Sequence, residues 1–344
     1  MKKITIAGGG LAGLSLGIGL RLKNVPVQVL ESGNYPRHRV CGEFVSGIRK
    51  DALEVLGIAD LFQGAERPQQ TAWFDNERVM FRGMLPEPAY GISRLALDEA
   101  LARRFVELGG ELLTGRRVAG EAEGEGMVWA TGRRAASGRN CVPGWVGVKG
   151  HYAGLDREAD LEVHLGNGAY VGVSGVEGGW VNVTGLFREG LVTGDGGRGE
   201  LLERAVLAAG LSGFARRLGS ARLRDGSVKG VNRFALGWQR GFGSGVRIGD
   251  AAAMIAPVTG NGMTMALQGA LAAVELLSQW SRGGISWMEA QSTLAAELRC
   301  LFSRRLRWAG ALQQVLMEGW SRRLCGELLG RGWVSFETLY QKVR

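Results

Sequence analysis

A glycine-rich turn near the start of the chain joins a short apolar run to a helical stretch. Ile4–Ala7 is apolar and rich in β-branched residues, residues 8–13 read GGGLAG, and a helix is expected over 14–23. This order of strand, turn and helix is the first half of a parallel βαβ unit that binds a dinucleotide. The turn therefore predicts an α/β fold with a Rossmann-like domain.

The residues around this turn have separate expected roles. Gly8 permits the tight turn, Gly10 lets a pyrophosphate approach the backbone, and Gly13 lets helix and strand pack closely. Amide groups at the start of the helix then face the anion. A second strand over 27–30 ends at Glu31, which is placed to accept both ribose hydroxyls of an adenosine and disfavours a 2′-phosphate. The alternative is a glycine-rich turn followed by a solvated glutamate.

A second glycine-rich segment favours FAD over NAD. A short strand ends at Gly249-Asp250, and PVTGNGM (257–263) opens another helix. Asp250 suits the hydroxyls of a ribityl chain, and the amides of 260–263 suit the flavin edge that gathers negative charge on reduction. A simple NAD dehydrogenase needs a catalytic histidine or a Tyr-x-x-x-Lys pair after the first motif, and we find neither. The alternative for this segment is an ordinary proline-glycine turn before a buried helix.

The two segments together resemble a known superfamily. GGGLAG with Glu31, followed by GDAAAMIAPVTGNGMTMAL (249–267), is similar to the FAD-dependent monooxygenases, geranylgeranyl reductases and flavin halogenases, which share a p-hydroxybenzoate hydroxylase-like fold. Three intermediate segments follow the family's order: YPRHRVCGE (35–43), ISRLALD (92–98) and VWATGR (128–133). The resemblance spans roughly residues 1 to 280. It implies FAD as the cofactor and NAD(P)H as the electron donor.

Alternating apolar runs predict a second sheet between the dinucleotide-binding segments. They fall at 71–74, 79–81, 161–165, 170–173 and 180–184. The expected architecture is α/β, with a Rossmann-like FAD-binding domain, an interleaved β-sheet substrate domain and a helical C-terminal region. The FAD-binding domain is assigned to 1–70, 90–150 and 245–280, the substrate domain to 71–89 and 151–244, and a helical cap to 281–344. Helices are expected there over 287–308 and 311–329.

The site residues follow from the motifs and the resemblance. Cys41 and Glu43 are candidate catalytic residues, although a packed thiol and a structural acid are the alternatives. Trp73, Trp180 and Phe187 are candidates for a substrate pocket, with packing in the core as the alternative. The resemblance places Arg94 and one of Arg37 and Arg39 at the cofactor. The expected cofactor contacts are Gly8, Gly10, Leu11, Ala12, Gly13, Glu31, Arg39, Arg94, Val118, Thr131, Gly249, Asp250, Pro257, Gly260, Asn261, Gly262 and Met263.

The implied activity is that of an FAD-dependent oxidoreductase on a hydrophobic substrate. We favour an NAD(P)H-dependent monooxygenase that hydroxylates through a flavin C4a-hydroperoxide. The alternatives are a geranylgeranyl-reductase-like reduction of isoprenoid double bonds, a flavin halogenase, and a non-catalytic lipid-binding escort module. Thr131 replaces the aspartate of the monooxygenases' Asp-Gly motif, and the halogenases' Trp-x-Trp-x-Ile-Pro element is missing from the sequence.

Composition bounds the compartment and the partners. Four cysteines without a CxxC pair and three scattered histidines support neither a disulfide framework nor a metal site, and no apolar run has the length of a membrane span. A cytoplasmic protein is expected, with a small hydrophobic substrate and no nucleic-acid partner. The net charge is +9, and residues 280–344 carry ten cations and five acids. These C-terminal helices either contact a membrane surface or carrier protein, or form a cap with a solvated basic face. The oligomeric state is left open.

Overall fold

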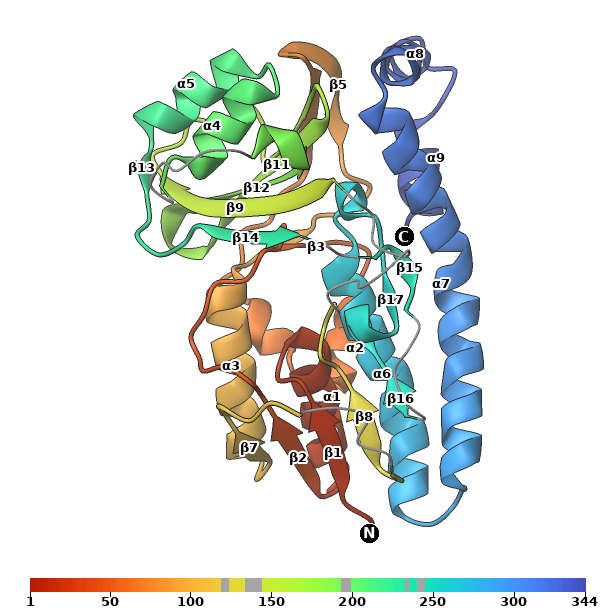
Figure 1. Cartoon of the computed structure of the whole chain (residues 1–344). Coiled ribbons are helices and arrows are strands. Elements are labelled where there is room, and N and C mark those ends of the chain that lie inside the picture. The colour runs from red at the N-terminus through yellow and green to blue at the C-terminus, as the bar shows by residue number, and fades with distance from the viewer. Residues whose placement is uncertain (119–123, 134–143, 193–198, 233–234, 240–244) are drawn as a thin grey trace.

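A computed structural model describes residues 1–118, 124–133, 144–192, 199–232, 235–239 and 245–344 (Figure 1). A parallel sheet with its helices forms the lower half of the molecule in Figure 1, and a larger sheet lies above it. The long helix α7 (Trp287–Met317) runs along the side of both halves. The site described below lies where the two halves meet.

The lower half is a five-stranded sheet in which every pairing is parallel. In spatial order its strands are β16 (Val246–Arg247), β8 (Met127–Trp129), β1 (Ile4–Ala7), β2 (Val27–Leu30) and β7 (Glu111–Leu113). Helices α1 (Leu11–Leu22), α3 (Arg94–Glu107) and α6 (Gly262–Ser281) accompany the sheet. The predicted unit of strand, glycine-rich turn, helix and strand is thus confirmed.

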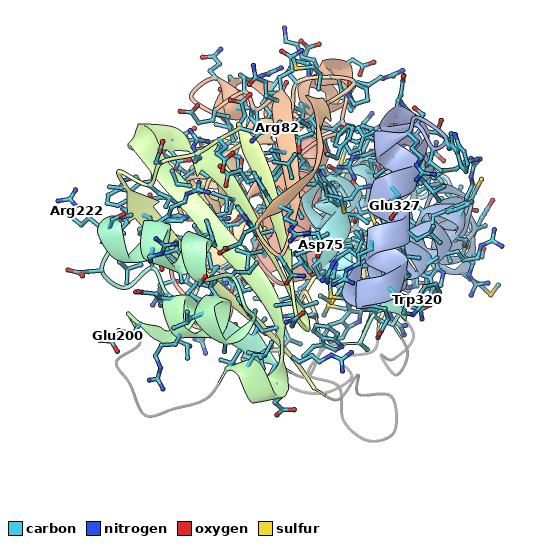
Figure 2. All side chains as sticks on the ribbon, turned by 90° about the horizontal axis from the view of Figure 1, so that it is seen from above. Asp75, Arg82, Glu200, Arg222, Trp320 and Glu327 are labelled. Atoms are coloured by element: carbon cyan, nitrogen blue, oxygen red, sulfur yellow. The ribbon has the colours of Figure 1, made fainter. Side chains whose placement is uncertain are left out.

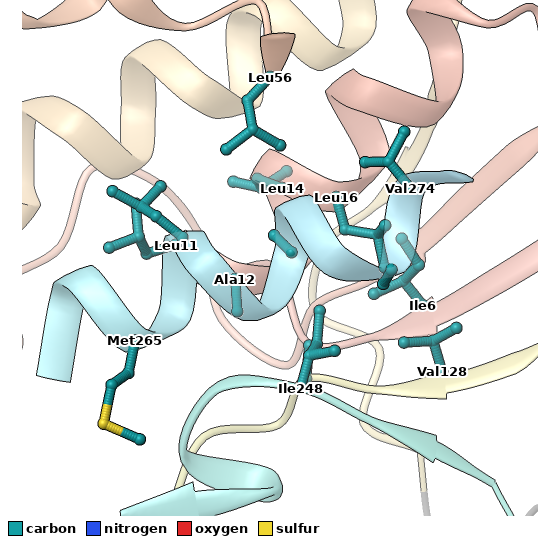
Figure 3. Close-up of a cluster of buried hydrophobic side chains, with 14 of the residues drawn as sticks. Ile6, Leu11, Ala12, Leu14, Leu16, Leu56, Val128, Ile248, Met265 and Val274 are labelled. Carbon is teal, nitrogen blue, oxygen red and sulfur yellow. The ribbon is translucent and has the colours of Figure 1, made fainter. Parts of the chain in front are cut away.

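Helix α1 is the centre of the hydrophobic core of this half. Leu14 and Leu16 pack with Ile6 of β1, Val128 of β8 and Val274 of α6 (Figure 3). Two small residues permit the close approach of the neighbouring helices. A Cβ atom on Gly17 would lie 2.8 Å from the Phe105 ring of α3, and one on Gly19 would lie 2.7 Å from Val274. The helix therefore packs tightly between α3 and α6, with its N-terminus held at the sheet edge.

The upper half is a twisted, mostly antiparallel sheet built from two separate stretches of chain. Strands β4 (Gln70–Asp75) and β5 (Arg78–Met84) come from the first stretch, and β4 pairs in parallel with β10. The other members are β9 (Trp145–Ala153), β10 (Leu161–Gly166), β11 (Ala169–Val176), β12 (Trp180–Arg188), β13 (Arg222–Leu223) and β14 (Lys229–Asn232). The second stretch was assigned from the sequence to residues 151–244. Its first strand, β9, already begins at Trp145.

The two faces of the upper sheet have different neighbours. Helices α4 (Leu201–Ala208) and α5 (Ser212–Ser220) cover one face, where Val181, Val183 and Phe187 of β12 are buried. Successive side chains of a strand point to opposite faces, so Thr184 and Leu186 lie on the other face, toward the lower half.

Two short ribbons connect the halves. One pairs β3 (Phe44–Val45) with β6 (Tyr90–Gly91), and the other pairs β15 (Gly237–Trp238) with β17 (Ala253–Met254). Helix α2 (Lys50–Val55) follows the first ribbon strand and belongs to the lower half. The two ribbons lie in segments of the chain that precede and follow the strands of the upper sheet in the sequence, apart from β4 and β5.

The C-terminal region is helical, with one difference from the sequence-based expectation. Helices were expected over 287–308 and 311–329, but α7 is one helix that continues to Met317. Gly310 has open space around its Cβ position and does not break the helix. The break comes at Glu318, whose backbone is extended, and α8 (Gly319–Gly330) and α9 (Phe336–Lys342) follow. Among the described residues, no helix combines the length and apolar character that crossing a bilayer requires.

Several C-terminal arginines point inward rather than into solvent. Arg322 is 2% exposed and donates to Asp75 of β4 over 2.7 Å, which ties α8 to the upper sheet. Figure 2 labels Asp75, together with Trp320 and Glu327 of α8. Arg305 is also buried. Trp320 and Trp333, by contrast, are 75% and 72% exposed. The local excess of positive charge is therefore smaller at the surface than the sequence suggests, and a membrane or carrier contact stays a prediction.

Candidate cofactor and substrate site

A cavity of about 940 Å³ lies between the carboxyl ends of the parallel strands and the upper sheet. Ala7, Leu30 and Trp129, which end β1, β2 and β8, line its floor. This is where open parallel sheets bind their ligands. All the expected cofactor contacts except Gly13 line it, namely Gly8, Gly10, Leu11, Ala12, Glu31, Arg39, Arg94, Val118, Thr131, Gly249, Asp250, Pro257, Gly260, Asn261, Gly262 and Met263.

Glycine is required in the first turn for two reasons. At some positions a side chain would clash with neighbouring backbone, and at another it would fill space that opens into the cavity. Gly8 has φ of +110°, and a Cβ there would lie 2.3 Å from the Ala130 carbonyl oxygen. A Cβ on Gly13 would lie 2.0 Å from the Gly8 oxygen, so Gly13 packs the turn and does not face the cavity. A Cβ on Gly10 would meet only the Arg94 and Arg39 guanidiniums, at 3.5 and 3.8 Å. The space above Gly10 is therefore open and surrounded by positive charge.

Asp98 holds these two guanidiniums in place. The Asp98 carboxylate is fully buried, and Arg94 donates to it from Nε over 2.7 Å and from Nη2 over 2.8 Å. Arg39 donates to the same carboxylate from Nε over 3.0 Å. Arg94 thus pairs with an acid of its own helix and also faces the cavity. Together with the N-terminus of α1, the two arginines give this part of the cavity the positive charge and amide donors that suit a diphosphate.

Glu31 is a buried carboxylate at the end of β2. It accepts hydrogen bonds from the backbone amides of Gly9 over 2.9 Å and Gly33 over 2.8 Å, and it pairs with Arg37 over 2.6 Å. Burial favours the neutral acid, but the Gly33 amide and the Arg37 and Arg39 charges outweigh it and hold the pKa of Glu31 below its ordinary value. A charged acceptor therefore stands where adenosine ribose hydroxyls are expected.

The second glycine-rich segment converges on the first. A Cβ on Gly249 would lie 2.9 Å from the Cβ of Ala12 in α1, so the two motifs are in contact. Gly260, with φ of +61°, turns the chain into α6, and a Cβ on Gly262 would meet no atom within 4 Å. The N-terminus of α6 is thus open to the cavity.

Asp250 lies between these two helix starts. Burial raises the pKa of its carboxyl, and the neighbouring Arg94 and Arg133 charges oppose that rise. Arg133 lines the cavity two residues after Thr131, and the sequence analysis did not assign it to the site. Arg133 is the last residue of the VWATGR segment that carries the resemblance, but the pattern of that segment did not mark its side chain as a cofactor contact.

Cys41 is held in a loop that crosses from the lower half to the upper sheet. Its carbonyl oxygen accepts from the Asn182 side-chain amide over 3.0 Å and from the Thr184 hydroxyl over 2.7 Å. Burial raises the pKa of the Cys41 thiol, so it stays protonated near neutral pH. The structure favours the packed-thiol interpretation of this cysteine. Next to it, Gly42 faces open space between two cavities.

Glu43 is the centre of a fully buried charged cluster that we call the junction cluster: Glu43, Lys149 and His151. Lys149 of β9 donates to the Glu43 carboxylate over 2.7 Å, His151 Nε2 contacts its second oxygen, and the Arg94 amide donates over 3.0 Å. Burial disfavours the charged acid, but His151 and Lys149 hold the pKa of Glu43 below its ordinary value. Glu43 is therefore a paired carboxylate, and it joins the loop between β2 and β3 (residues 31–43), which we call the cofactor loop, to the upper sheet.

Lys149 and His151 were missed by the sequence analysis. The available sign was Lys-x-His in an otherwise apolar run, because residues two apart on a strand share a face. His38 connects this cluster to the cavity: it lines the cavity, and its ring lies edge-on to His151 with centroids 5.0 Å apart. Burial and the Lys149 charge lower the pKa of His38 to about 4.

A second, apolar cavity of about 140 Å³ adjoins the first, and we call it the apolar pocket. The two cavities share Gly42, Phe44, Tyr170, Thr184, Pro257 and Gly260 as walls. Its other walls come from β4, β5, α7, α8 and α9, and include Trp73, Phe81, Leu316, Leu329, Phe336 and Tyr340. A hydrophobic molecule in this pocket would lie against the Pro257–Gly260 turn, where the flavin ring is expected.

Of the three aromatic residues expected to line a substrate pocket, only Trp73 does so. Phe187 is fully buried on the opposite face of the sheet, among the side chains under α4 and α5. Trp180 lies at the start of β12 beside Arg222 and Arg224, whose guanidinium carbons are 5.9 and 5.0 Å from its ring centre. The expectation was wrong for Phe187 because the face that a strand residue occupies depends on the sheet register. Trp180 shares a face with Thr184, but it lies at the far end of β12 and lines neither cavity.

Solved structures with the same fold include flavin-dependent enzymes. No protein-family model matches the sequence, and no curated protein matches it. The flavin-dependent brominase Bmp2 aligns with a TM-score of 0.78 and 16% identity, over 99% of this chain and 92% of its own. PqsL of P. aeruginosa in complex with 2-aminobenzoylacetate aligns at 0.74 and 17%, over 94% and 98%. The p-nitrophenol 4-monooxygenase PnpA of Pseudomonas putida aligns at 0.77 and 14%, over 100% and 97%. The predicted p-hydroxybenzoate hydroxylase-like fold is thereby confirmed, and the chain has the fold shared by these flavin-dependent monooxygenases and halogenases.

Proposed function

We propose that this protein is an FAD-dependent oxidoreductase, and specifically an NAD(P)H-dependent monooxygenase that acts on a small hydrophobic molecule. One observation carries the proposal: the first glycine turn and the α6 N-terminus open into one cavity, and an apolar pocket adjoins that cavity at the flavin-ring end. The volume of the cofactor cavity lies at the upper end of the range for small-molecule and cofactor sites.

The residues present fit FAD. Arg39, Arg94 and the α1 amides would hold the diphosphate, and Glu31 would accept the ribose hydroxyls. Asp250 would accept hydroxyls of the ribityl chain, and the amides at the start of α6 would face the pyrimidine edge. When bound, FAD supplies hydride transfer and oxygen activation, chemistry that side chains lack.

The protein's own contribution to such a reaction is position and exclusion of water. The apolar pocket would exclude water from the substrate, and the junction cluster fixes the loop that carries Gly42, a wall shared by the two cavities. None of the described side chains needs to act as a covalent nucleophile. Cys41 and Glu43 are therefore proposed as positioning residues rather than catalytic ones.

The donor and the compartment are part of the same proposal. Reduced nicotinamide is proposed as the source of electrons, as the resemblance implies. The described cysteines Cys41, Cys300 and Cys325 are unpaired, which suits the reducing cytoplasm where NAD(P)H is available.

A reductase is the second candidate, and the position of one segment favours it. The Cys41-Gly42-Glu43 stretch, which resembles the reductase branch, lies at the wall between the cofactor cavity and the apolar pocket. In that version the pocket holds a carbon–carbon double bond, and oxygen takes no part in product formation.

The first test is whether the purified protein carries FAD and consumes NAD(P)H and oxygen together. We expect flavin absorption bands, and oxidation of NADPH or NADH that one-ring phenols accelerate. Hydroxylated product should form only with oxygen present. Product formed equally well without oxygen would instead identify a reductase, and a folded protein without flavin affinity would identify a non-catalytic module.

Gly10→Val tests the cofactor site itself. The Gly10 backbone is extended and its Cβ direction is open, so the substitution is tolerated sterically but fills the diphosphate site. We expect flavin binding to fall at least about 100-fold, since charge-assisted contacts to the diphosphate are lost, with little change in melting temperature. Gly310→Ala in α7, which also has open space, is the matched control and should bind FAD normally.

A further inference from the structure

Two buried hydrogen-bond donors on neighbouring side chains lie in the wall of the apolar pocket. The Tyr340 hydroxyl and the Arg344 Nε have only each other's side chains as polar neighbours, and neither makes a hydrogen bond of good geometry to a described residue. Tyr340 itself is 6% exposed, and both residues line the pocket. Buried polar groups of this kind are rare in folded proteins, and each calls for a missing partner.

The Arg344 side chain is held firmly beside the pocket. Its Nη1 donates to the Thr259 carbonyl oxygen over 2.9 Å, and its guanidinium carbon lies 4.5 Å from the Tyr340 ring centre. Its stem packs on Gly47, where a Cβ would lie 2.8 Å from the Arg344 Cδ. The backbone is anchored as well, since Asn261 donates to the Val343 oxygen and Arg305 donates to the Arg344 main-chain oxygen over 2.8 Å.

Arg344, like the buried Arg305, has no carboxylate side chain as a partner among the described residues, whereas two other arginines of the C-terminal region do. Arg322 pairs with Asp75 over 2.7 Å, and Arg331 pairs with Glu327 over 3.8 Å. Within the described ranges, no carboxylate side chain comes within ion-pair distance of Arg344. Burying a cation without an anion is costly, so a ligand that brings an anion to this wall gains a strong contact.

The size of the pocket limits that ligand. Its volume of about 140 Å³ is close to that of an engineered cavity of roughly 150 Å³ that binds benzene. Most of its lining is apolar, including Trp73, Phe81 and Phe336. The pocket therefore suits one ring with one polar group directed at Arg344 and Tyr340.

We propose that Arg344 and Tyr340 are specificity-determining residues that bind an acidic group of the substrate, so that the pocket selects one-ring hydrophobic acids over their neutral analogues. This rests on the proposed function for the identity of the pocket as the substrate site. The recognition itself needs only the pocket: the guanidinium Nε and the phenol hydroxyl donate to one carboxylate while the ring packs among the aromatic walls.

The test compares benzoate with benzamide, which differ in charge but hardly in shape. Binding is followed by the flavin absorption change in the FAD-loaded protein and by tryptophan fluorescence, to which Trp73 contributes. We expect wild-type protein to bind benzoate at least about 10-fold more tightly than benzamide, the size expected for a hydrogen bond to a charged group. Arg344→Gln should abolish the preference, Arg344→Lys should keep part of it, and Tyr340→Phe should reduce it less than Arg344→Gln.

Controls separate the possible failures. Arg331→Gln removes an exposed arginine of the same region and should leave the preference unchanged. If Arg344→Gln fails to fold, the ratio of benzoate to benzamide affinity in Tyr340→Phe and Arg344→Lys is compared with that of wild type instead. Equal affinity for the two ligands, or a preference that survives Arg344→Gln, overturns the inference. Absence of flavin overturns the proposed function, and the fluorescence titration then still tests the selectivity of the pocket.

Discussion

The upper sheet contains two buried clusters with nearly the same chemistry. In the junction cluster, Glu43 is paired with Lys149 and His151, which lie two residues apart on β9. In a second cluster, which we call the helix cluster, Glu162 is paired with His164, two residues along β10, and with Arg217 of α5. Both carboxylates are fully buried, and in both the histidine Nε2 contacts the acid.

The two clusters differ in what they connect. Glu43 comes from the cofactor loop, so the junction cluster ties the lower half to the upper sheet, and His38 links it to the cofactor cavity. The helix cluster ties α5 to the sheet, and the His164 ring is stacked between Phe74 and Phe214, at 4.6 and 4.3 Å. A buried acid–histidine pair is therefore not by itself a mark of a functional site, because the junction cluster borders the cofactor cavity whereas the helix cluster holds α5 on the sheet.

Glu43→Ala should have the largest effect on this comparison. It leaves the Lys149 ammonium buried without its carboxylate, which costs about 3–5 kcal/mol of folding free energy, and it frees the loop that lines the cofactor cavity. We expect both a loss of stability in urea denaturation and a loss of bound flavin. Flavin content unchanged at a concentration where the variant is folded would show that the junction cluster does not position the cofactor loop.

Glu162→Ala is the matched variant in the helix cluster and should affect stability alone. Arg217 is partly exposed and can regain water, so we expect a smaller cost of about 1–3 kcal/mol. FAD affinity, measured by fluorescence quenching under conditions where the protein is folded, should equal that of wild type. A drop in FAD affinity comparable to that of Glu43→Ala would remove the distinction between the clusters.

Thr184→Val tests the attachment of the cofactor loop without removing a charge. The substitution keeps the side-chain shape and removes the hydrogen bond to the Cys41 carbonyl oxygen, and with it the oxygen that accepts from the Asn182 amide over 3.1 Å, while Asn182 can still donate to Cys41. We expect a loss of about 1 kcal/mol in the free energy of unfolding and a several-fold weaker FAD affinity. A variant with normal FAD affinity would show that Asn182 and Glu43 hold the loop without Thr184.

The smallest expected effect is a pH dependence specific to the junction cluster. His38 faces Lys149, His151, Glu43 and Arg224, and its pKa of about 4 lies below the ordinary 6.5. Since the unfolded chain takes up the proton first, His38 stabilises the fold above pH 6.5 and this contribution is lost as the pH falls from 6.5 toward 4. Both glutamates have lowered pKa values, so their contributions are lost only at lower pH, below their ordinary value.

His38→Gln should therefore flatten the fall in melting temperature between pH 7 and 5, where the glutamates of both clusters remain charged. Thermal unfolding of the variant and wild type across this range gives the measurement. If the melting temperature falls equally steeply with pH in the two proteins, His38 is not the cause of the loss of stability between pH 7 and 5.

The sequence revealed the parts of the site that depend on local backbone geometry. The turns at Gly8–Gly13 and Gly260–Met263 require glycine for reasons that act within a few residues, so a local sequence motif is enough to predict them. Glu31 follows directly from the length of β2. These features needed no knowledge of the upper sheet.

The parts that were missed depend on contacts between distant segments. Lys149 meets Glu43 across 106 positions of the chain, and the apolar pocket takes its walls from several separate elements. Phe187 was misplaced because an alternating pattern defines two faces without saying which one a partner covers. Two helices, 287–308 and 311–329, were expected where α7 runs unbroken to Met317, because the packing that supports a continuous helix is a tertiary property.

The contact between Gly249 and Ala12 has a consequence for biosynthesis. The first glycine turn, which is proposed to bind the diphosphate, leaves the ribosome early. The turn before α6, which is proposed to face the flavin ring, follows only after the whole upper sheet has been made. A nascent chain cannot complete the proposed cofactor site until α6 has emerged, so we expect FAD to bind only late in maturation.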